Sequence, residues 1–207
     1  ILHKADLPSE AYEISMTESK LLIRAGDAAG AFYAIQSIRS LLPAEAFRGN
    51  RPRLYIPAVE VKDAPRFGFR AFMLDVGRNF HSKQQVLRVL DLMALYKLNV
   101  FHFHFSEDEG WRIEMPSLPE LTAIGARRGF PVDESKQLMP SFGSGPDNHS
   151  SGTGHYTKAE FMEILKYAHA RHIKVIPEIE SPGHARAAVV SMKARYERLM
   201  KEGKKEA

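Results

Sequence analysis

The second two-thirds of the chain alternates apolar segments with helical segments, and this alternation constrains the fold more than any other feature. Ser82 with Gln85, and Thr157 with Glu160, form capping boxes that predict two helices. A third helix is expected from about residue 184. Strands that alternate with helices pair in parallel through right-handed crossovers, so this region predicts an α/β fold. The apolar segments, each expected to be a strand, are residues 69–77, 99–105 and 173–179.

The pattern of apolar residues also predicts which faces are buried. The mostly apolar residues 69–77 are typical of a strand that is covered on both faces. The helix after Ser82 is expected to bury a stripe made of Val86, Val89, Leu90, Met93 and Tyr96. A helix nearer the amino terminus is expected to bury Ala31, Ile35, Ile38 and Leu42.

The beginning of the chain reads as a separate, small α+β unit. Residues 12–17 and 20–25 are short alternating runs that predict a hairpin. Asp27 is placed to cap the helix that follows, and Pro43 ends it. We therefore predict two domains, a small α+β domain and an α/β domain, over residues 1–65 and 66–207.

Composition excludes several classes of function. Hydrophobic residues make up 44% of the chain and charged residues 26%, as in an ordinary globular protein. No apolar run approaches the roughly 20 residues that cross a bilayer, so membrane insertion is not expected. The net charge of +4 comes without a stripe of aromatic and basic residues, so no nucleic-acid partner is expected. The absence of cysteine excludes disulfides and thiolate metal sites.

Each predicted strand ends in a polar cluster. In parallel α/β folds, active sites are built at the carboxyl ends of the strands. We therefore expect the residues at these three ends to share one site. In chain order they are Asp75, Arg78, Glu107, Asp108, Glu180 and His184.

The histidines of the second strand have two interpretations. His102 and His104 share one side of that strand by alternation, and we interpret them first as hydrogen-bonded core residues. The alternative is a metal-dependent barrel hydrolase, with His102, His104, His184 and an acid as ligands. Glu178 and Glu180 also alternate, which fits either a paired-carboxylate site or a salt bridge.

The segment between the second strand and the third has no hydrophobic period. Residues 131–154 are rich in glycine, serine and proline, and such long loops in compact domains are functional or mobile. Trp111, the only tryptophan, is expected to pack in the interior rather than to form a stacking platform.

Three segments together resemble glycoside hydrolase family 20, the β-N-acetylhexosaminidases, in order and spacing: LDVGRNF, HFHFSEDEGWR and IPEIESPGH. The resemblance covers nearly the whole chain. It implies a small amino-terminal α+β domain followed by the first three strand-helix units of a (β/α)8 TIM barrel. A complete barrel typically needs about 250 residues, so we expect an incomplete barrel and a fragment of a longer enzyme.

The resemblance also implies roles for the site residues. Arg78 is expected to bind hydroxyls of the terminal sugar. His184 is expected to support the acid/base glutamate, with Glu107 or Asp108 as its acidic partner. The family usually has aspartate at both of these positions, so Glu107 departs from the pattern. The other residues expected on the substrate side are Asp75, His104 and Glu180.

The mechanism that the resemblance implies is substrate-assisted retention, in which the 2-acetamido oxygen of the sugar attacks the anomeric carbon. A glutamate protonates the leaving oxygen, and the aspartate before it orients the acetamido group. This Asp-Glu pair lies on the fourth barrel strand in the family, so we expect it downstream of Ala207.

We therefore expect a parent enzyme that removes terminal β-linked N-acetylglucosamine or N-acetylgalactosamine without a cofactor. The chain alone is expected to be inactive. A non-catalytic fragment that binds sugar is a further alternative. Export to the periplasm or to the outside of the cell is expected, as for other polysaccharide-degrading enzymes.

Overall fold

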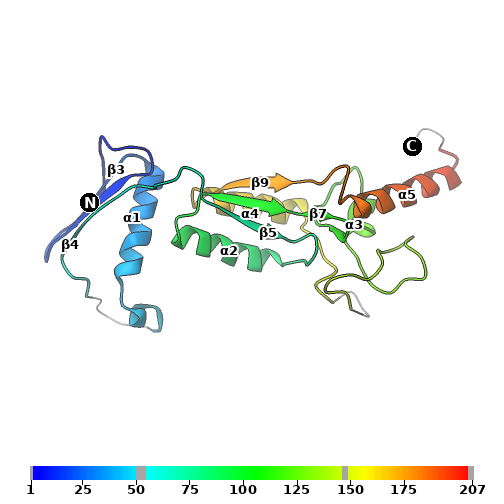
Figure 1. The fold of residues 1–207 in the computed structure, drawn as a ribbon, viewed down its shortest axis with the longest axis horizontal. Coiled ribbons are helices and arrows are strands. Elements are labelled where there is room, and N and C mark those ends of the chain that lie inside the picture. Colours follow the sequence, from blue (N-terminus) through cyan, green and yellow to red (C-terminus); the bar gives the residue numbers. More distant parts are fainter. Residues whose placement is uncertain (1, 50–54, 146–148, 205–207) are drawn as a thin grey trace.

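The computed structural model describes residues 2–49, 55–145 and 149–204, and it has an α/β fold. The molecule is elongated (Figure 1). A sheet with one helix occupies the amino-terminal end, a parallel sheet lies in the middle, and helix α5 (Arg186–Lys201) reaches the other end. Among the helices of these described residues, none is long and apolar enough to cross a membrane.

The amino-terminal unit is a four-stranded sheet packed against one helix. Strands β2 (Tyr12–Met16) and β3 (Leu21–Ala25) form the predicted antiparallel hairpin. Asp27 caps α1 (Ala28–Leu41), because its carboxylate accepts a hydrogen bond from the Gly30 amide. The remaining elements of this unit are the strands β1 (Leu2–Lys4) and β4 (Val59–Asp63) and the short 3-10 helix η1 (Ala44–Phe47).

The predicted buried stripe of α1 is wrong at Ile35. The helix turns Tyr33, Ala34 and Gln36 into the interior, whereas Ile35 is exposed. The prediction followed the spacing of the aliphatic residues. The ring of Tyr33 takes the buried place instead, and its hydroxyl donates a hydrogen bond to Glu10 at 3.0 Å.

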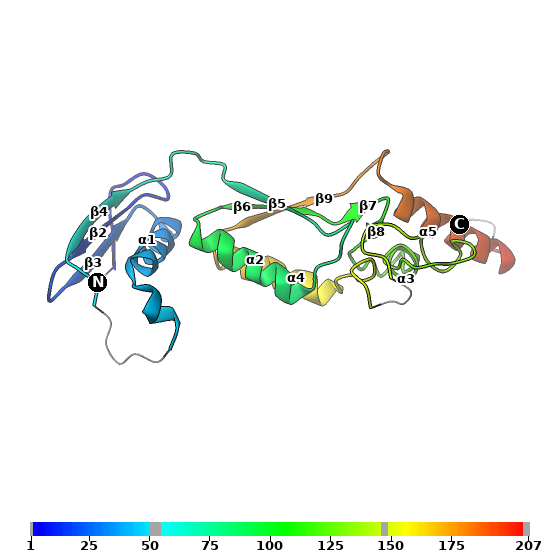
Figure 2. The same ribbon diagram turned by 60° about the horizontal axis from the view of Figure 1, so that its bottom comes forward.

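The second unit is a parallel sheet of three strands in the order β5-β6-β9. Helices α2 (Lys83–Leu95) and α4 (Lys158–His169) lie side by side along this sheet and pack on one of its faces (Figure 2). Both helices begin at the capping boxes that the sequence predicts. The strands are β5 (Ala71–Asp75), β6 (Val100–His104) and β9 (Lys174–Glu178).

The core of this unit lies between the central strand and the two helices. Phe101 and Phe103 of β6 are fully buried and belong to the same cluster as Leu90 of α2 and Ile164 of α4. The phenylalanines therefore face the helices, and the histidines between them face the opposite side, as alternation predicts.

Two predictions of burial in this unit are wrong. β5 is not covered on both faces, since Phe72 and Met73 are exposed. Within the described ranges, β5 is an edge strand that pairs with β6 alone, so fewer neighbours cover it. Tyr96 is exposed as well, because it is the C-cap residue of α2 and lies beyond the last turn of the buried stripe.

A long excursion, residues 105–156, connects β6 to α4, and the buried Arg112 binds several of its segments. The guanidinium of Arg112 is fully buried and donates hydrogen bonds of 2.8–3.2 Å to backbone carbonyls. Burial lowers the pKa of Arg112 to about 9, which leaves the group charged at neutral pH. The carbonyls belong to Val76, Gly77, Ala126, Gly152 and Gly154.

The excursion has little regular structure. Its elements are the two-residue strands β7 (Ser106–Glu107) and β8 (Gly110–Trp111) and the short helix α3 (Glu120–Ala123). In the predicted loop over residues 131–154, turns and bends prevail, and residues 146–148 lie outside the described part.

The predicted third helix is α5, and it packs on the excursion. Trp111, Leu121 and Ala187 belong to one buried cluster. The indole Nε1 of Trp111 donates a hydrogen bond to the Ile113 carbonyl at 2.7 Å. The prediction that Trp111 packs in the interior is therefore confirmed.

Among the residues that the structure describes, two ion pairs join the amino-terminal unit to the unit of the parallel sheet. Arg70 Nη2 lies 2.9 Å from Glu10 Oε1, and Lys97 Nζ lies 2.9 Å from Asp63 Oδ2. The Tyr33 hydroxyl also accepts a hydrogen bond from Arg70 at 3.1 Å. Polar contacts therefore hold the two units against each other.

Candidate functional site

Three side chains from three neighbouring strands line up at the carboxyl edge of the parallel sheet. Asp75 pairs in register with His104, and His104 pairs in register with Glu178. Each is the last residue of its strand. Because the strands are parallel, the segments that follow them begin at this same edge.

Arg78 follows β5 and lies between two carboxylates. Its Nη1 is 2.5 Å from Asp75 Oδ2, and its Nη2 is 2.5 Å from Glu107 Oε1. The Arg78 amide also donates to Asp75 Oδ1 at 3.0 Å. These contacts fix the direction of the guanidinium, while the side chain remains 36% exposed.

Glu107 is the buried member of this group, with 2% of its surface exposed. Its Oε1 lies 2.8 Å from His184 Nδ1, and its Oε2 accepts a hydrogen bond from the Asp108 amide at 2.6 Å. A Cβ on Gly77 would lie 2.9 Å from the Glu107 Cβ, so the absence of a side chain at Gly77 makes room for this carboxylate.

His184 reaches this carboxylate from the segment between β9 and α5. Its backbone has a φ of +52°, in the left-handed region that non-glycine residues rarely adopt. The side chain is mostly exposed apart from its contact with Glu107. More than half of the His184 side chain is therefore accessible.

Asp108 and Glu180 have contacts of other kinds. Asp108 Oδ1 accepts a hydrogen bond from the Arg186 amide at 2.9 Å, which satisfies the first residue of α5. The Glu180 amide donates to Ser106 Oγ at 2.9 Å, and Glu180 Oε1 lies 3.8 Å from His104 Nδ1. Asp108 therefore anchors a helix, whereas the Glu180 carboxylate faces the interior of the site.

Glu178 holds both histidines of β6. Its Oε2 lies 2.6 Å from His104 Nδ1 and 2.7 Å from His102 Nε2. Burial raises the pKa of Glu178, but the hydrogen bond from His104 and the charges of both histidines outweigh it, so the pKa is lowered overall. Glu178 is therefore a carboxylate at neutral pH.

The Asp75 and Arg78 pair is also charged. Burial acts to raise the pKa of Asp75, but the hydrogen bonds from the amide and the guanidinium of Arg78 lower it overall. The hydrogen bond to Asp75 raises the pKa of Arg78. The site therefore presents a cation held by anions at neutral pH.

The three histidines of the metal hypothesis do not come together. Within the described ranges, the groups with metal-ligand spacing are His104 with Glu178 and Glu180, and Glu107 with Asp108 and His184. His184 is therefore in a different group from His104, and His102 is in neither. Arg78 also already binds Glu107 of the second group. The geometry does not favour the metal-dependent hydrolase.

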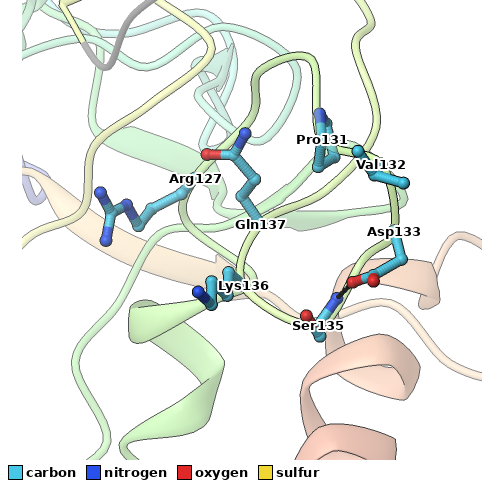
Figure 3. Close-up of a pocket in the computed structure, with 7 residues that line it drawn as sticks. All are labelled: Arg127, Pro131, Val132, Asp133, Ser135, Lys136 and Gln137. Carbon is cyan, nitrogen blue, oxygen red and sulfur yellow. Dashed lines mark hydrogen bonds between the residues drawn. The ribbon is translucent and has the colours of Figure 1, made fainter.

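A cavity of about 440 Å³ lies elsewhere, in the excursion (Figure 3). Its lining includes Arg127, Val132 and Lys136, which are exposed, and Asp133, which accepts a hydrogen bond from the Ser135 amide. The residues that the sequence predicts for the site do not line it. The cavity is therefore separate from the site formed by Asp75, Arg78 and Glu107.

Sequence reasoning missed two buried arginines that support the site. Arg112 binds the carbonyls of Val76 and Gly77, directly before Arg78. Arg128 donates to the Arg78 carbonyl at 2.6 Å and to the Glu109 carbonyl at 2.8 Å. No local pattern distinguishes them from surface arginines. Glu178 was recognised only as a possible partner of Glu180.

The parallel sheet and the charged side chains at its carboxyl edge define a class of α/β protein. In this class, side chains at the carboxyl ends of parallel strands form the active site. The chain belongs to glycosyl hydrolase family 20. Residues 67–207 match the family's catalytic domain, and residues 1–64 match its domain 2.

Relatives of known name agree with this assignment. An N,N'-diacetylchitobiase of Vibrio harveyi is 55% identical over 196 residues, which are 95% of this chain and 22% of that protein. A beta-hexosaminidase of Vibrio vulnificus is 47% identical over 195 residues, or 94% of this chain and 22% of that protein. The chain therefore spans about a fifth of the length of these relatives.

Solved structures show the same likeness. A family 20 exo beta-N-acetylglucosaminidase from Vibrio harveyi, solved in complex with N-acetylglucosamine, superposes with a TM-score of 0.81 at 37% identity. The match covers 93% of this chain and 29% of that one. A beta-N-acetylhexosaminidase from Bacteroides fragilis matches with a TM-score of 0.77 at 38% identity, over 96% of this chain and 36% of that one.

Proposed function

We propose that the protein to which this chain belongs hydrolyses terminal, non-reducing β-linked N-acetylglucosamine or N-acetylgalactosamine. The observation that carries the proposal is the setting of Arg78, whose guanidinium is held by Asp75 and Glu107 and yet remains partly exposed. A planar fork of donors in a fixed direction suits adjacent hydroxyls of one sugar ring better than a lysine does. Asp75 and Glu180 line the same subsite.

The proposed reaction is substrate-assisted and retains the anomeric configuration. The 2-acetamido oxygen of the sugar attacks the anomeric carbon, and a glutamic acid protonates the leaving oxygen. In this chain, Glu107 orients His184, and His184, whose side chain is 56% exposed, supports that glutamic acid. The acid and the aspartate before it are expected in the sequence that follows, because the chain covers about a fifth of its curated relatives.

We further propose that β5, β6 and β9 are the first three strands of a (β/α)8 barrel. The likeness to family 20 structures supports this arrangement. β5 and β9 are the edges of the sheet. In a barrel these edges pair with the last strand and the fourth strand. The amino-terminal domain then ends near residue 65.

Hydrolysis of an aryl β-N-acetylglucosaminide tests the function. The 207-residue chain is compared with the protein translated to the stop codon of its gene. We expect turnover by the longer protein alone, and turnover that persists in a metal chelator. A longer protein that is folded and does not hydrolyse the substrate overturns the proposal. Calorimetry with N-acetylglucosamine then shows whether the protein is a non-catalytic sugar binder.

A further inference from the structure

His104 lies between two groups of charged side chains and contacts the first of them directly. Its Nδ1 is 2.6 Å from Glu178 Oε2, at the end of the neighbouring strand. A carboxylate only accepts hydrogen bonds, so Nδ1 carries the hydrogen in this contact. This fixes the orientation of the ring and directs Nε2 toward the opposite strand.

The Nε2 atom of His104 faces the second group. It is buried and has no hydrogen-bond partner among the described residues. Its neighbours are Glu107 Oε1 at 3.8 Å and Asp75 Oδ1 at 3.9 Å. These distances are longer than hydrogen bonds, but both carboxylate oxygens lie beside the same buried ring nitrogen. The edge of the ring therefore backs both carboxylates and limits how they can move.

The same two carboxylates hold Arg78 from the other side. Glu107 Oε1 and Asp75 Oδ2 each lie 2.5 Å from a guanidinium nitrogen of Arg78. The His104 side chain is 4% exposed, against 36% for Arg78. Arg78 is therefore accessible to a sugar, while His104 lies behind its two partners and out of reach.

We infer that His104 is a positioning residue, which holds Asp75 and Glu107 where they orient Arg78 and does not itself touch the substrate. The inference rests on the proposed function, in which Arg78 binds the sugar. It replaces the expectation that His104 binds the substrate directly. His104 acts through Arg78, so its contribution depends on the presence of Arg78.

A double-mutant cycle in the full-length protein tests this dependence. The variants are His104→Asn, Arg78→Lys and the two combined, and the readout is kcat/KM for an aryl β-N-acetylglucosaminide. Asparagine retains a donor near the Nδ1 position and removes the group that faces Asp75 and Glu107. We expect losses of about tenfold for His104→Asn and about 100-fold for Arg78→Lys, mostly as an increase in KM. The double variant should match Arg78→Lys within about twofold.

Two further variants separate positioning from packing. His104→Gln places an amide near the Nε2 position and should recover part of the activity that His104→Asn loses. His102→Gln is the matched control, since His102 lies on the same face of β6 and contacts the same Glu178 oxygen. No contact of His102 with Asp75 or Glu107 is found in the described part of the chain. The loss of kcat/KM caused by His102→Gln should multiply with the loss caused by Arg78→Lys when the two are combined.

The outcomes decide the inference independently of the proposed function. Losses that multiply to about 1,000-fold in the double variant overturn it, as does a loss below about twofold for His104→Asn. If the wild-type protein does not hydrolyse the substrate, the proposed function fails, and the same cycle is read in melting temperature. Non-additive shifts for His104→Asn with Arg78→Lys then support the positioning role, and additive shifts overturn it.

Discussion

Glu107 and His184 are 77 positions apart in the sequence, yet Oε1 of Glu107 lies 2.8 Å from Nδ1 of His184. The contact joins β7, which follows the central strand, to the segment that precedes α5. The same carboxylate binds Arg78, so one buried side chain orients both a guanidinium and an imidazole. The extra methylene of glutamate, compared with the aspartate usual in the family, is compatible with both contacts.

We expect Glu107→Gln to lower kcat/KM of the full-length protein by about 10- to 100-fold. The amide removes the charge that pairs with Arg78 and places a donor against one of its two partners, and hydrogen bonds to charged groups contribute about 1.5–3 kcal/mol each. The measurement is steady-state hydrolysis of an aryl β-N-acetylglucosaminide.

Glu107→Asp is the matched variant for this position. It retains the charge but is one methylene shorter, so it reaches Arg78 or His184 but not both. We expect a smaller loss than for Glu107→Gln, of less than about tenfold, because the charged hydrogen bond to one partner is retained. Equal activity of the glutamine variant and the wild type would show that the Glu107 carboxylate does not contribute to the site.

Gly77→Ala should displace the Glu107 side chain while leaving its carboxylate unchanged. An added Cβ would lie 2.9 Å from the Glu107 Cβ, which is closer than real Cβ contacts come, so the strand end or the loop must shift. Such a shift of groups that position the substrate costs about tenfold or more in kcat/KM. Gly68→Ala is the control, because an added Cβ there meets nothing within 4 Å. Similar kinetics for the two alanine variants would contradict the prediction.

Arg112→Met should destabilise the excursion. The apolar side chain fills similar space but removes a donor from five carbonyls, of which the Ala126 carbonyl still accepts a hydrogen bond from the Gly154 amide, and an unpaired buried polar group costs about 1–3 kcal/mol. We expect a melting temperature at least several degrees lower and faster proteolysis within residues 105–156. Arg127→Met, at a neighbouring exposed arginine, is the control and should change neither quantity.

Glu10→Gln should change how stability depends on pH. The hydrogen bond from Arg70 lowers the pKa of Glu10 below its ordinary 4.5, against the opposing effect of burial. The folded state therefore keeps this carboxylate charged where the unfolded chain already binds a proton. Its stabilising contribution is present above the unfolded pKa and is lost as pH falls through the folded pKa.

Melting temperatures at pH 7 and below pH 4 check this prediction. We expect Glu10→Gln to cost about 1–3 kcal/mol at pH 7 and less at acid pH. Glu13→Gln is the control, because the Arg24 that pairs with Glu13 is more than half exposed and such pairs contribute little. A difference between Glu10→Gln and the wild type that stays constant with pH would contradict the linkage.

Local signals in the sequence were sufficient for the elements and for most of the site. Asp27, Ser82 and Thr157 predicted helix starts because caps act within one turn of the chain. The alternation of β6 predicted the two faces of the strand because side chains repeat every two residues. Parallel strands end at one edge, so their polar ends were expected together.

Burial could not be predicted where tertiary neighbours decide it. Phe72 of β5 is apolar and exposed, because an edge strand has fewer neighbours than its sequence suggests. Arg112 is charged and fully buried, because carbonyls from distant segments surround it. The position of β5 at the edge of the sheet is not encoded in the residues around Phe72. The carbonyls that Arg112 binds are likewise far from it in the sequence.

Arg112 and the five carbonyls that it binds order the excursion as a bound metal ion would. Calcium sites order loops by gathering carboxylate and carbonyl oxygens around a bound cation. Here the positive charge is a side chain of the loop's own polypeptide, and it brings five carbonyls together without exchange with solvent. Because the cation is covalently part of the chain, neither dilution nor a chelator can remove it.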